Sequence, residues 1–268
     1  MDRRATDGLG SLDGAAGGFT QGHGVDRPPR LARAGAPDGH DPGDPVDADA
    51  AERHTRIRAQ PGCRRVKLIG SEASPYVRFV RVALAELGMT YTFETTAPFA
   101  KLTAEQHERI NQANPLMKVP VLETGDGTLF DSRVIVDWLL SRPGYADAEF
   151  ARGFRENFDR INALTTAYGI LESGVLRFLI RMRHPDTDMD SGYMGRSRER
   201  IDSGLSWLEA TPVLGPSFGP PEALVCCALA WLERRSVHDV SAYSRLNRLA
   251  ADYGQRPSLA TTRIPEDA

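Results

Sequence analysis

The sequence is poor in cysteine and has no long hydrophobic run. Of its 268 residues only Cys63, Cys226 and Cys227 are cysteines, and they form no regularly spaced set. Neighbouring residues on a helix point about 100° apart, so Cys226 and Cys227 suit neither a metal site nor an easy disulfide. We interpret the cysteines as buried core thiols of a cytoplasmic protein. Because no apolar run reaches about 18 residues, no segment is expected to span a membrane.

The chain also lacks a strong charge of one sign and an N-terminal targeting pattern. Its formal net charge is -3, whereas a general nucleic-acid binder usually carries a basic face, so nucleic acid is not expected as a partner. The N-terminus has no apolar core of a secretory signal, and its many aspartates are untypical of a transit peptide.

Residues 1–65 have few large apolar residues, no periodicity and no lysine, and they are rich in Gly, Pro, Ala, Asp and Arg. Such a segment cannot bury enough apolar surface to offset the entropy lost on ordering. We therefore predict a disordered N-terminal extension. Its arginine and aspartate charges nearly cancel, so it is not expected to act as an electrostatic arm.

From Val66 the pattern changes to that of a folded α/β domain. A short apolar strand ends at Gly70, and Ser74 followed by proline is typical of a helix start. Apolar residues then recur at helical spacing until Gly88, and a β-branched and aromatic strand follows at 91–95. A second helix is expected at 102–112. The strands "VPVLE" and "TLF", joined by "TGDG", precede the helix "DSRVIVDWLLSR".

These elements predict the order βαβ-αββα over residues 66–143, followed by an all-helical domain over 149–264. The first helix of that domain is expected to bend or break near Gly169 or Gly174. Trp207, Trp231 and Leu246 are expected to anchor its core. The predicted helices are 149–182, 192–210, 221–235 and 241–254.

Four groups of segments, in order, resemble the glutathione S-transferase family. They are "ASPYVRFVRVALAELGMTYTF", "NPLMKVPVLE", "LFDSRVIVDWL", and "VCCALAWLERR" with "RPSLATTRI". The resemblance covers about residues 66–264. It implies a thioredoxin-like N-terminal domain, glutathione as co-substrate, no metal, and a cytoplasmic homodimer. The implied activity is detoxification, by conjugation of the glutathione thiolate to a hydrophobic electrophile.

Within this resemblance, Ser74 of "SPYV" takes the place of the first cysteine of the glutaredoxin motif Cys-Pro-Tyr-Cys, and Val77 that of the second. Dithiol exchange needs both thiols, so redox turnover of that kind is excluded. A serine at a helix N-terminus can instead help the thiol of glutathione to ionise, and we assign Ser74 this catalytic role. The alternative is a plain helix cap. Ser71 and Tyr76 are rival hydroxyl donors in the same site.

Two further motifs complete the glutathione site that the resemblance implies. Val119-Pro120 is expected to be a cis bond at which the backbone of Val119 pairs with the cysteinyl part of glutathione; the alternative is an edge-strand proline. Ser132 is expected to bind the γ-glutamyl carboxylate at a helix N-terminus, with Asp131 near the ammonium. The alternative for these two is simple capping. Lys118 belongs to the same binding set.

The chain departs from the family pattern at two places. Met117 stands where many members have glycine, next to the cysteinylglycine end of the ligand. Gly219 stands where the family often has a capping Ser or Thr before its sixth helix, and losing such a cap costs about 0.5–2 kcal/mol. Glu222 can replace the usual Asp there, and Pro220 and Pro221 can partly compensate by fixing the entry.

The electrophile pocket is expected between the domains, near Tyr168, Leu171 and Arg177 of the long helix. Two other functions remain open at this point. One is a protein-interaction module without turnover, because a fold does not fix a function. The other is a glutathione-dependent isomerase or dehalogenase, which shares the site and differs only in its substrate.

Related proteins usually begin with Met directly before "KLIGSEASPYV", where this chain has Val66. We therefore predict that translation starts at a GTG codon for Val66 and that residues 1–65 are rarely made. Mass spectrometry of the native protein checks this. Abundant peptides from residues 1–60 would contradict it.

Overall fold

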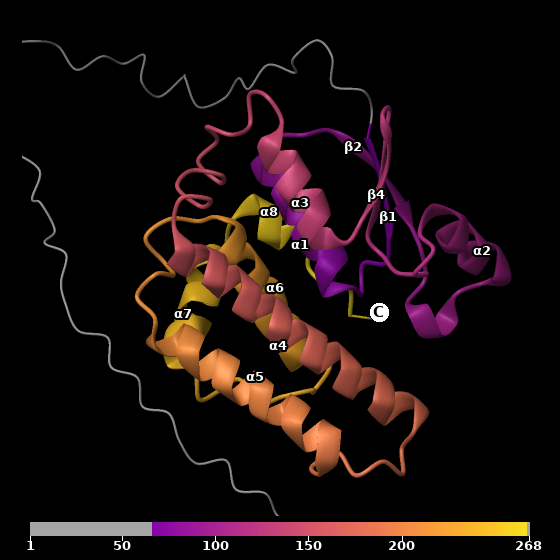
Figure 1. Cartoon of the computed structure of the whole chain (residues 1–268), viewed down its shortest axis with the longest axis vertical. Coiled ribbons are helices and arrows are strands. Elements are labelled where there is room, and N and C mark those ends of the chain that lie inside the picture. Colours follow the sequence, from indigo (N-terminus) through magenta and orange to yellow (C-terminus); the bar gives the residue numbers. More distant parts are fainter. Residues whose placement is uncertain (1–65, 267–268) are drawn as a thin grey trace, which may run out of the picture. The chain divides into compact units, whose positions relative to one another are not determined.

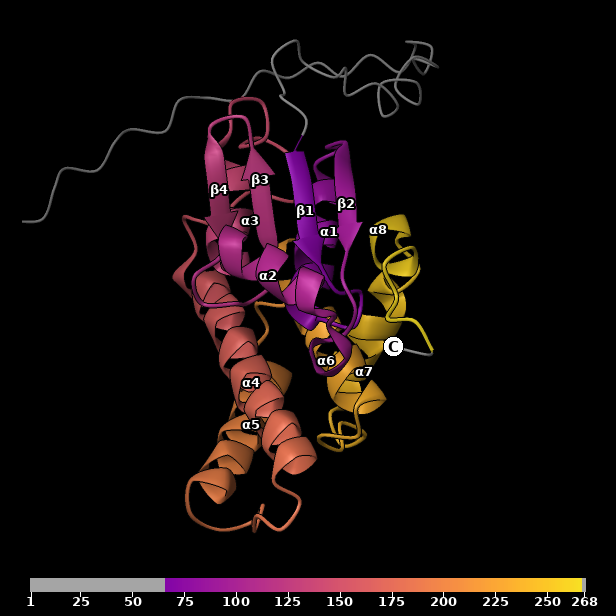
Figure 2. The ribbon, with the colours of Figure 1, turned by 90° about the vertical axis from the view of Figure 1, so that its right-hand side faces the viewer.

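The computed structural model describes residues 66–266. The predicted disorder of 1–65 and the burial of Cys63 lie outside these residues. The first described part is a four-stranded mixed sheet with three helices (Figure 1). Its strand order is β2-β1-β3-β4 (Figure 2). Figure 2 shows α1 and α3 on one face of the sheet and α2 on the other. The elements are β1 (Val66–Gly70), α1 (Pro75–Glu86), β2 (Tyr91–Thr95), a 3-10 turn (Phe99–Lys101), α2 (Ala104–Ala113), β3 (Val121–Thr124), β4 (Gly127–Phe130) and α3 (Ser132–Ser141).

This order confirms the thioredoxin-like βαβ-αββα prediction. Strand β1 runs parallel to β2 and antiparallel to β3, which in turn runs antiparallel to β4. Helix α1 begins where predicted, with Ser74 as its cap and Pro75 as its first residue. It ends before Gly88, which has a φ of 63° that glycine adopts without steric cost.

A helical region follows, again as predicted. Its residues and those of the sheet layer share one hydrophobic core cluster, from Val66 in β1 to Leu259 near the C-terminus. Because the two parts share one core, the core does not mark a boundary between them, and the predicted domain boundary at 143–149 stays a prediction. The helices are α4 (Phe158–Arg183), α5 (Gly192–Ala210), α6 (Pro220–Arg234), α7 (Ser244–Tyr253) and α8 (Pro257–Ala260).

The long helix begins later than predicted, and it does not break. Helix α4 begins at Phe158, because the side chain of Asn157 caps it by accepting the Arg160 N–H at 3.1 Å. The helix then runs unbroken to Arg183. Gly174 serves close packing: a Cβ there would lie 2.9 Å from a methyl group of Leu232 in α6.

The predicted core anchors are right for two residues of three. Trp231 and Leu246 are buried, but Trp207 is 41% exposed. The buried residues of α5 form one stripe that includes Ile201, Leu205 and Leu208. Trp207 lies beside this stripe, because adjacent helical positions point about 100° apart.

Helix α4 is long and apolar enough to cross a membrane by length and composition, with a mean hydropathy of 1.2 over its apolar window. Half of that window is buried inside the protein. It packs against α5 and α6, as the core helix of a helical layer does.

The entry to α6 explains why glycine replaces the usual cap. The carboxylate of Glu222 accepts the backbone N–H of Gly219 at 3.0 Å and two bonds from Arg160, at 3.0 and 2.7 Å. A Cβ at position 219 would lie 2.8 Å from the Arg160 guanidinium. The Glu222 carboxylate therefore takes over the role of the missing cap, and the Arg160 guanidinium, which reaches from α4, occupies the space that a capping side chain needs.

Candidate functional site

The register of the sheet brings the three predicted site segments to one end of its strands. Ile69 at the end of β1 pairs with Val121 at the start of β3. Val121 in turn pairs with Phe130 at the end of β4. The turn after β1, the residues before β3 and the start of α3 therefore meet at the same end of the sheet. These segments hold Ser71 to Ser74, Val119-Pro120 and Asp131-Ser132.

The first segment is the turn into α1. The Oγ of Ser74 accepts the backbone N–H of Val77 at 3.3 Å, so the predicted cap is confirmed. Within residues 66–266, the hydroxyl hydrogen of Ser74 has no hydrogen-bond acceptor, and the side chain is only partly buried. Ser71 is 5% exposed, and its Oγ accepts the N–H of Ala73 at 3.3 Å. Of the two serines, Ser74 is therefore the more accessible.

Tyr76 packs toward the helical layer. Its ring stacks on Tyr168 of α4, with a centroid distance of 6.2 Å and an angle of 11° between the planes. Burial raises the pKa of Tyr76 above its ordinary value, and burial likewise raises the pKa of Tyr168. Both phenols stay protonated at neutral pH, so either can act as a hydrogen-bond donor but not as a base.

The second segment is the loop before β3. The Val119-Pro120 bond is cis, as the resemblance implied. Pro120 is buried, Val119 is partly buried, and Lys118 is exposed. Buried Asn114 holds the loop: its amide nitrogen donates to the carbonyl of Lys118 at 2.8 Å, and its Oδ1 accepts the N–H of Leu116 at 2.9 Å. Sequence reasoning gave Asn114 no role, although it opens the quoted "NPLMKVPVLE" segment.

The same loop explains the usual glycine at position 117. Met117 has a φ of 53°, in the left-handed region that favours glycine, and its N–H donates to the carbonyl of Asn114 at 2.8 Å. Its side chain is 40% exposed. The glycine of relatives therefore suits a backbone turn, which this chain forms with methionine.

The third segment is the start of α3. Asp131 is exposed and caps the helix by accepting the N–H of Arg133 at 2.8 Å. Ser132 is buried, and its Oγ lies 3.0 Å from the hydroxyl of Tyr168. The guanidinium of Arg133 lies 4.3 Å from the centroid of the Tyr168 ring. Arg133 was not singled out by the sequence analysis. Its position directly after Ser132, at the start of a predicted helix, was the signal that could have placed it near the site.

Of the three residues of the long helix predicted near the electrophile pocket, one borders the candidate site. Tyr168 contacts Ser132, Tyr76 and Arg133, and so borders the site. Leu171 is fully buried in the core. Arg177 is buried and donates to the carbonyls of Met189 and Met194 at 2.7 and 2.6 Å. It therefore ties α4 to the start of α5, and the predicted electrophile pocket near it stays a prediction.

Cys226 and Cys227 of α6 are buried free thiols, as predicted. Burial raises the pKa of the Cys227 thiol to about 11, so this thiol stays protonated at neutral pH and is a poor nucleophile. Among residues 66–266, no group of three or more His, Cys, Asp or Glu side chains is arranged to hold a metal ion.

Comparison with known proteins gives one consistent family. Residues 68–147 match the model of the glutathione S-transferase N-terminal domain. The uncharacterized GST-like protein YibF of Escherichia coli is 29% identical over 208 residues, which span 75% of this chain and 100% of YibF.

Two solved structures also match 75% of this chain. A glutathione transferase family member from Pseudomonas fluorescens, with bound glutathione, has a TM-score of 0.63 and 30% identity, covering 75% of this chain and 99% of that one. A glutathione S-transferase from Methylobacillus flagellatus, also with glutathione bound, has a TM-score of 0.65 and 27% identity, covering 75% of this chain and 100% of that one. The site at one end of the sheet, the cis proline and these relatives together show that the chain belongs to the glutathione S-transferase family.

Proposed function

We propose that the protein is a glutathione transferase that conjugates the glutathione thiolate to a hydrophobic electrophile. One observation carries this proposal: Ser74, the cis bond at Val119-Pro120 and Ser132 lie together at one end of the sheet's strands. Family members with bound glutathione support it. In the reaction, the thiolate sulfur forms a bond to an electrophilic carbon, and the electron pair of the broken bond leaves with the displaced group.

Each part of glutathione has a matching group at this end of the sheet. We place the γ-glutamyl carboxylate at the N-terminus of α3, with Ser132, because helix N-termini favour anions. Asp131 is exposed beside it and suits the γ-glutamyl ammonium. The backbone of Val119 pairs with the cysteinyl part in the manner of an added strand. Lys118 is exposed next to Val119 and completes the set.

Ser74 is the proposed catalytic residue. Its oxygen already accepts the Val77 N–H, which leaves its hydroxyl hydrogen to donate to a thiolate. Lowering a thiol pKa by two units takes about 2.7 kcal/mol. A helix N-terminus contributes about 0.3–1 kcal/mol, and a hydrogen bond to a charged acceptor about 1.5–3 kcal/mol. These two effects together are large enough to ionise bound glutathione at neutral pH.

Replacing Ser132 with alanine is expected to weaken glutathione binding by about tenfold, because a hydrogen bond to a carboxylate is lost. Isothermal titration of glutathione into the full chain measures this, and the unchanged protein should bind in the micromolar to millimolar range. The control is Ser141→Ala, at the exposed C-terminal end of the same helix. No heat with the unchanged protein would favour a protein-interaction module. Equal affinity of Ser132→Ala and the control would remove Ser132 from the site.

We also propose a cytoplasmic homodimer, since family members are usually dimers. Sedimentation of the purified full chain should give about twice the chain mass of 29.4 kDa. A single species at the chain mass, at micromolar concentration, would contradict the dimer.

A further inference from the structure

Helix α2 is attached to the sheet differently from α1 and α3. It covers the opposite face of the sheet (Figure 2). Of its ten residues only Ile110 is buried, whereas α1 and α3 each bury a row of apolar side chains. Because the hydrophobic effect scales with the apolar area removed from water, it contributes little to holding α2 in place. Other interactions must therefore hold α2 against the sheet.

A cluster of four charged side chains joins α2 to three strands. The guanidinium of Arg109 in α2 donates to both oxygens of Glu94 in β2, at 3.0 and 3.3 Å, and to Oε1 of Glu123 in β3 at 2.8 Å. The Nζ of Lys67 in β1 lies 3.3 Å from Glu94 and 3.5 Å from Glu123. Arg109 is the one member of the cluster that belongs to α2, so the ionic link between helix and sheet passes through its guanidinium.

The cluster is ionised and open to solvent. Burial works against ionisation of Glu94, but its hydrogen bonds to Arg109 and Lys67 hold the pKa of that carboxyl below its usual range. The hydrogen bond to Glu123 in turn raises the pKa of Arg109. The four side chains are between 29% and 42% exposed. Salt ions therefore reach these contacts and screen their attraction.

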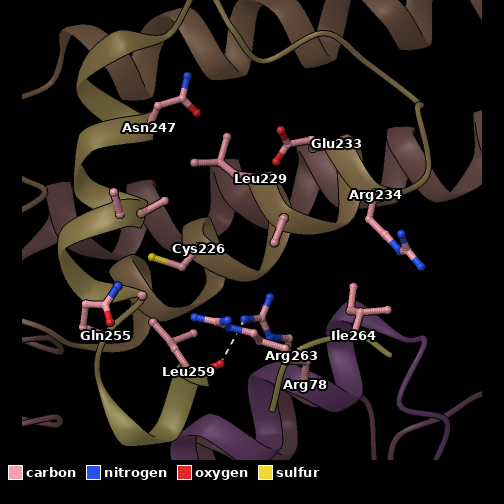
Figure 3. A pocket seen from close by; sticks show the side chains of 14 residues that line it. Arg78, Cys226, Leu229, Glu233, Arg234, Asn247, Gln255, Leu259, Arg263 and Ile264 are labelled. Carbon is pink, nitrogen blue, oxygen red and sulfur yellow. Dashed lines mark hydrogen bonds between the residues drawn. The ribbon is translucent and has the colours of Figure 1, made fainter. Parts of the chain in front are cut away.

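Two other arginines join helices through neutral acceptors instead. Arg78 of α1 donates to the carbonyl of Leu259 in α8 at 3.2 Å, beside a pocket of about 430 Å³ (Figure 3). Arg177 of α4 donates to two backbone carbonyls, as described above. Both arginines are buried, and salt screens buried contacts much less than exposed ones. The attachment of α2 is therefore more sensitive to salt than these two contacts.

Helix α2 leads directly into the loop that the proposed function assigns to glutathione. Asn114 ends the helix, and its N–H donates to the carbonyl of Ile110 at 2.8 Å. The side chain of Asn114 then holds the carbonyl of Lys118 and the N–H of Leu116. Val119 follows directly. A displacement of α2 would therefore move Asn114, and with it the backbone proposed to pair with the cysteinyl part of glutathione.

We propose that Arg109 is a positioning residue for glutathione binding. Its contacts with Glu94 and Glu123 hold α2, and through Asn114 the loop before β3, where the loop can pair with the ligand. This inference rests on the proposed function of the site. It gives the ionic cluster an effect on glutathione affinity although no member of the cluster is assigned to the ligand.

Hydrogen exchange of the full chain tests the structural step without any ligand. Arg109→Gln should speed exchange of the backbone amides of residues 104–119 by about fivefold, because the helix and loop open more often, and should leave α1 and α3 unchanged. The matched control is Lys67→Gln. It removes a cation from the same two carboxylates but leaves Arg109 in place, so residues 104–119 should exchange as in the unchanged protein. Equal exchange in Arg109→Gln and the unchanged protein would overturn the proposal.

Isothermal titration and kinetics test the functional step. Arg109→Gln should weaken glutathione binding by about fivefold and raise the KM for glutathione equally, with kcat unchanged, because Ser74 lies on another segment. Arg109→Lys should restore part of the affinity, since it keeps the charge but not the paired geometry. Raising the ionic strength from about 0.1 to about 1 M should weaken binding more in the unchanged protein than in Arg109→Gln, which has no such contacts to lose.

The outcomes separate this inference from the function on which it rests. Faster exchange in Arg109→Gln with unchanged glutathione affinity would overturn the positioning role and leave the proposed function intact. An equal fall in affinity in Lys67→Gln would overturn it too, because the effect would then belong to the charge of the cluster and not to the attachment of α2. No binding of glutathione by the unchanged protein would overturn the proposed function, and the positioning role with it.

Discussion

Replacing Glu222 with glutamine is expected to lower the free energy of unfolding by about 3–5 kcal/mol, because it leaves the buried guanidinium of Arg160 without its charge partner. Glu222 is fully buried and Arg160 is 7% exposed. Besides Arg160, the carboxylate accepts the N–H groups of Gly219 and Gly215, and Arg160 also donates to the carbonyl of Val213 at 3.3 Å. The network therefore joins α4 to the start of α6, and denaturant unfolding measures its loss.

The matched control is Asp137→Asn, the same change of carboxylate to amide in an exposed pair. Asp137 lies 2.6 Å from Arg155, with side chains 67% and 41% exposed. Exposed pairs contribute about 0–1 kcal/mol, so this variant should unfold almost as the unchanged protein does. Equal losses in Glu222→Gln and Asp137→Asn would show that the Arg160 network is not what stabilises the entry of α6.

Replacing Ser74 with alanine is expected to raise the pKa of enzyme-bound glutathione by about one to two units, because the thiolate loses a hydrogen bond worth about 1.5–3 kcal/mol. If the bound thiol has a pKa of about 6.5 in the unchanged protein, its thiolate fraction at pH 7, and turnover with it, should fall about 3- to 25-fold. The pH dependence of thiolate absorbance in the complex gives the pKa directly. Ser74→Thr should restore most of the effect, since it keeps the hydroxyl.

Loss of the helix cap must be separated from loss of the thiol contact. Ser74→Ala removes a cap worth about 1 kcal/mol. Thr103→Ala removes an equivalent cap from α2, where the threonine accepts the Gln106 N–H at 3.2 Å. If Thr103→Ala lowers stability similarly but leaves the thiol pKa unchanged, Ser74 acts on the thiol. An unchanged pKa in Ser74→Ala would return Ser74 to a purely structural role and make Ser71 and Tyr76 the next candidates.

Much of the fold was predictable because local sequence determines where regular elements begin and end. Ser74-Pro75 and Gly88 bound α1 through capping and backbone preferences that need no distant partner. The alternation of strands and helices then restricts the sheet to few topologies. The cis bond before Pro120 followed from family resemblance rather than from propensity.

Other features depended on contacts between residues far apart in the chain. The apolar residues before Phe158 favoured an earlier start for α4, but Phe150 and Phe154 are buried in turns, where the ring centroid of Phe150 lies 5.9 Å from that of Phe218. The contact between Ser132 and Tyr168 joins residues 36 positions apart. No local pattern predicts which helix will border the site.

The sequence by itself determined the element order, the cap at Ser74 and the segments that form the candidate site, since these follow from short-range preferences and family motifs. Only the tertiary structure decided that Arg160 occupies the space of a cap at Gly219, that Arg177 ties two helices together, and that Arg78 lies buried beside a pocket. The physical reason is the same in each case. The function of an arginine depends on which carbonyls, carboxylates and cavities the folded chain brings to its guanidinium, and these lie far away in sequence.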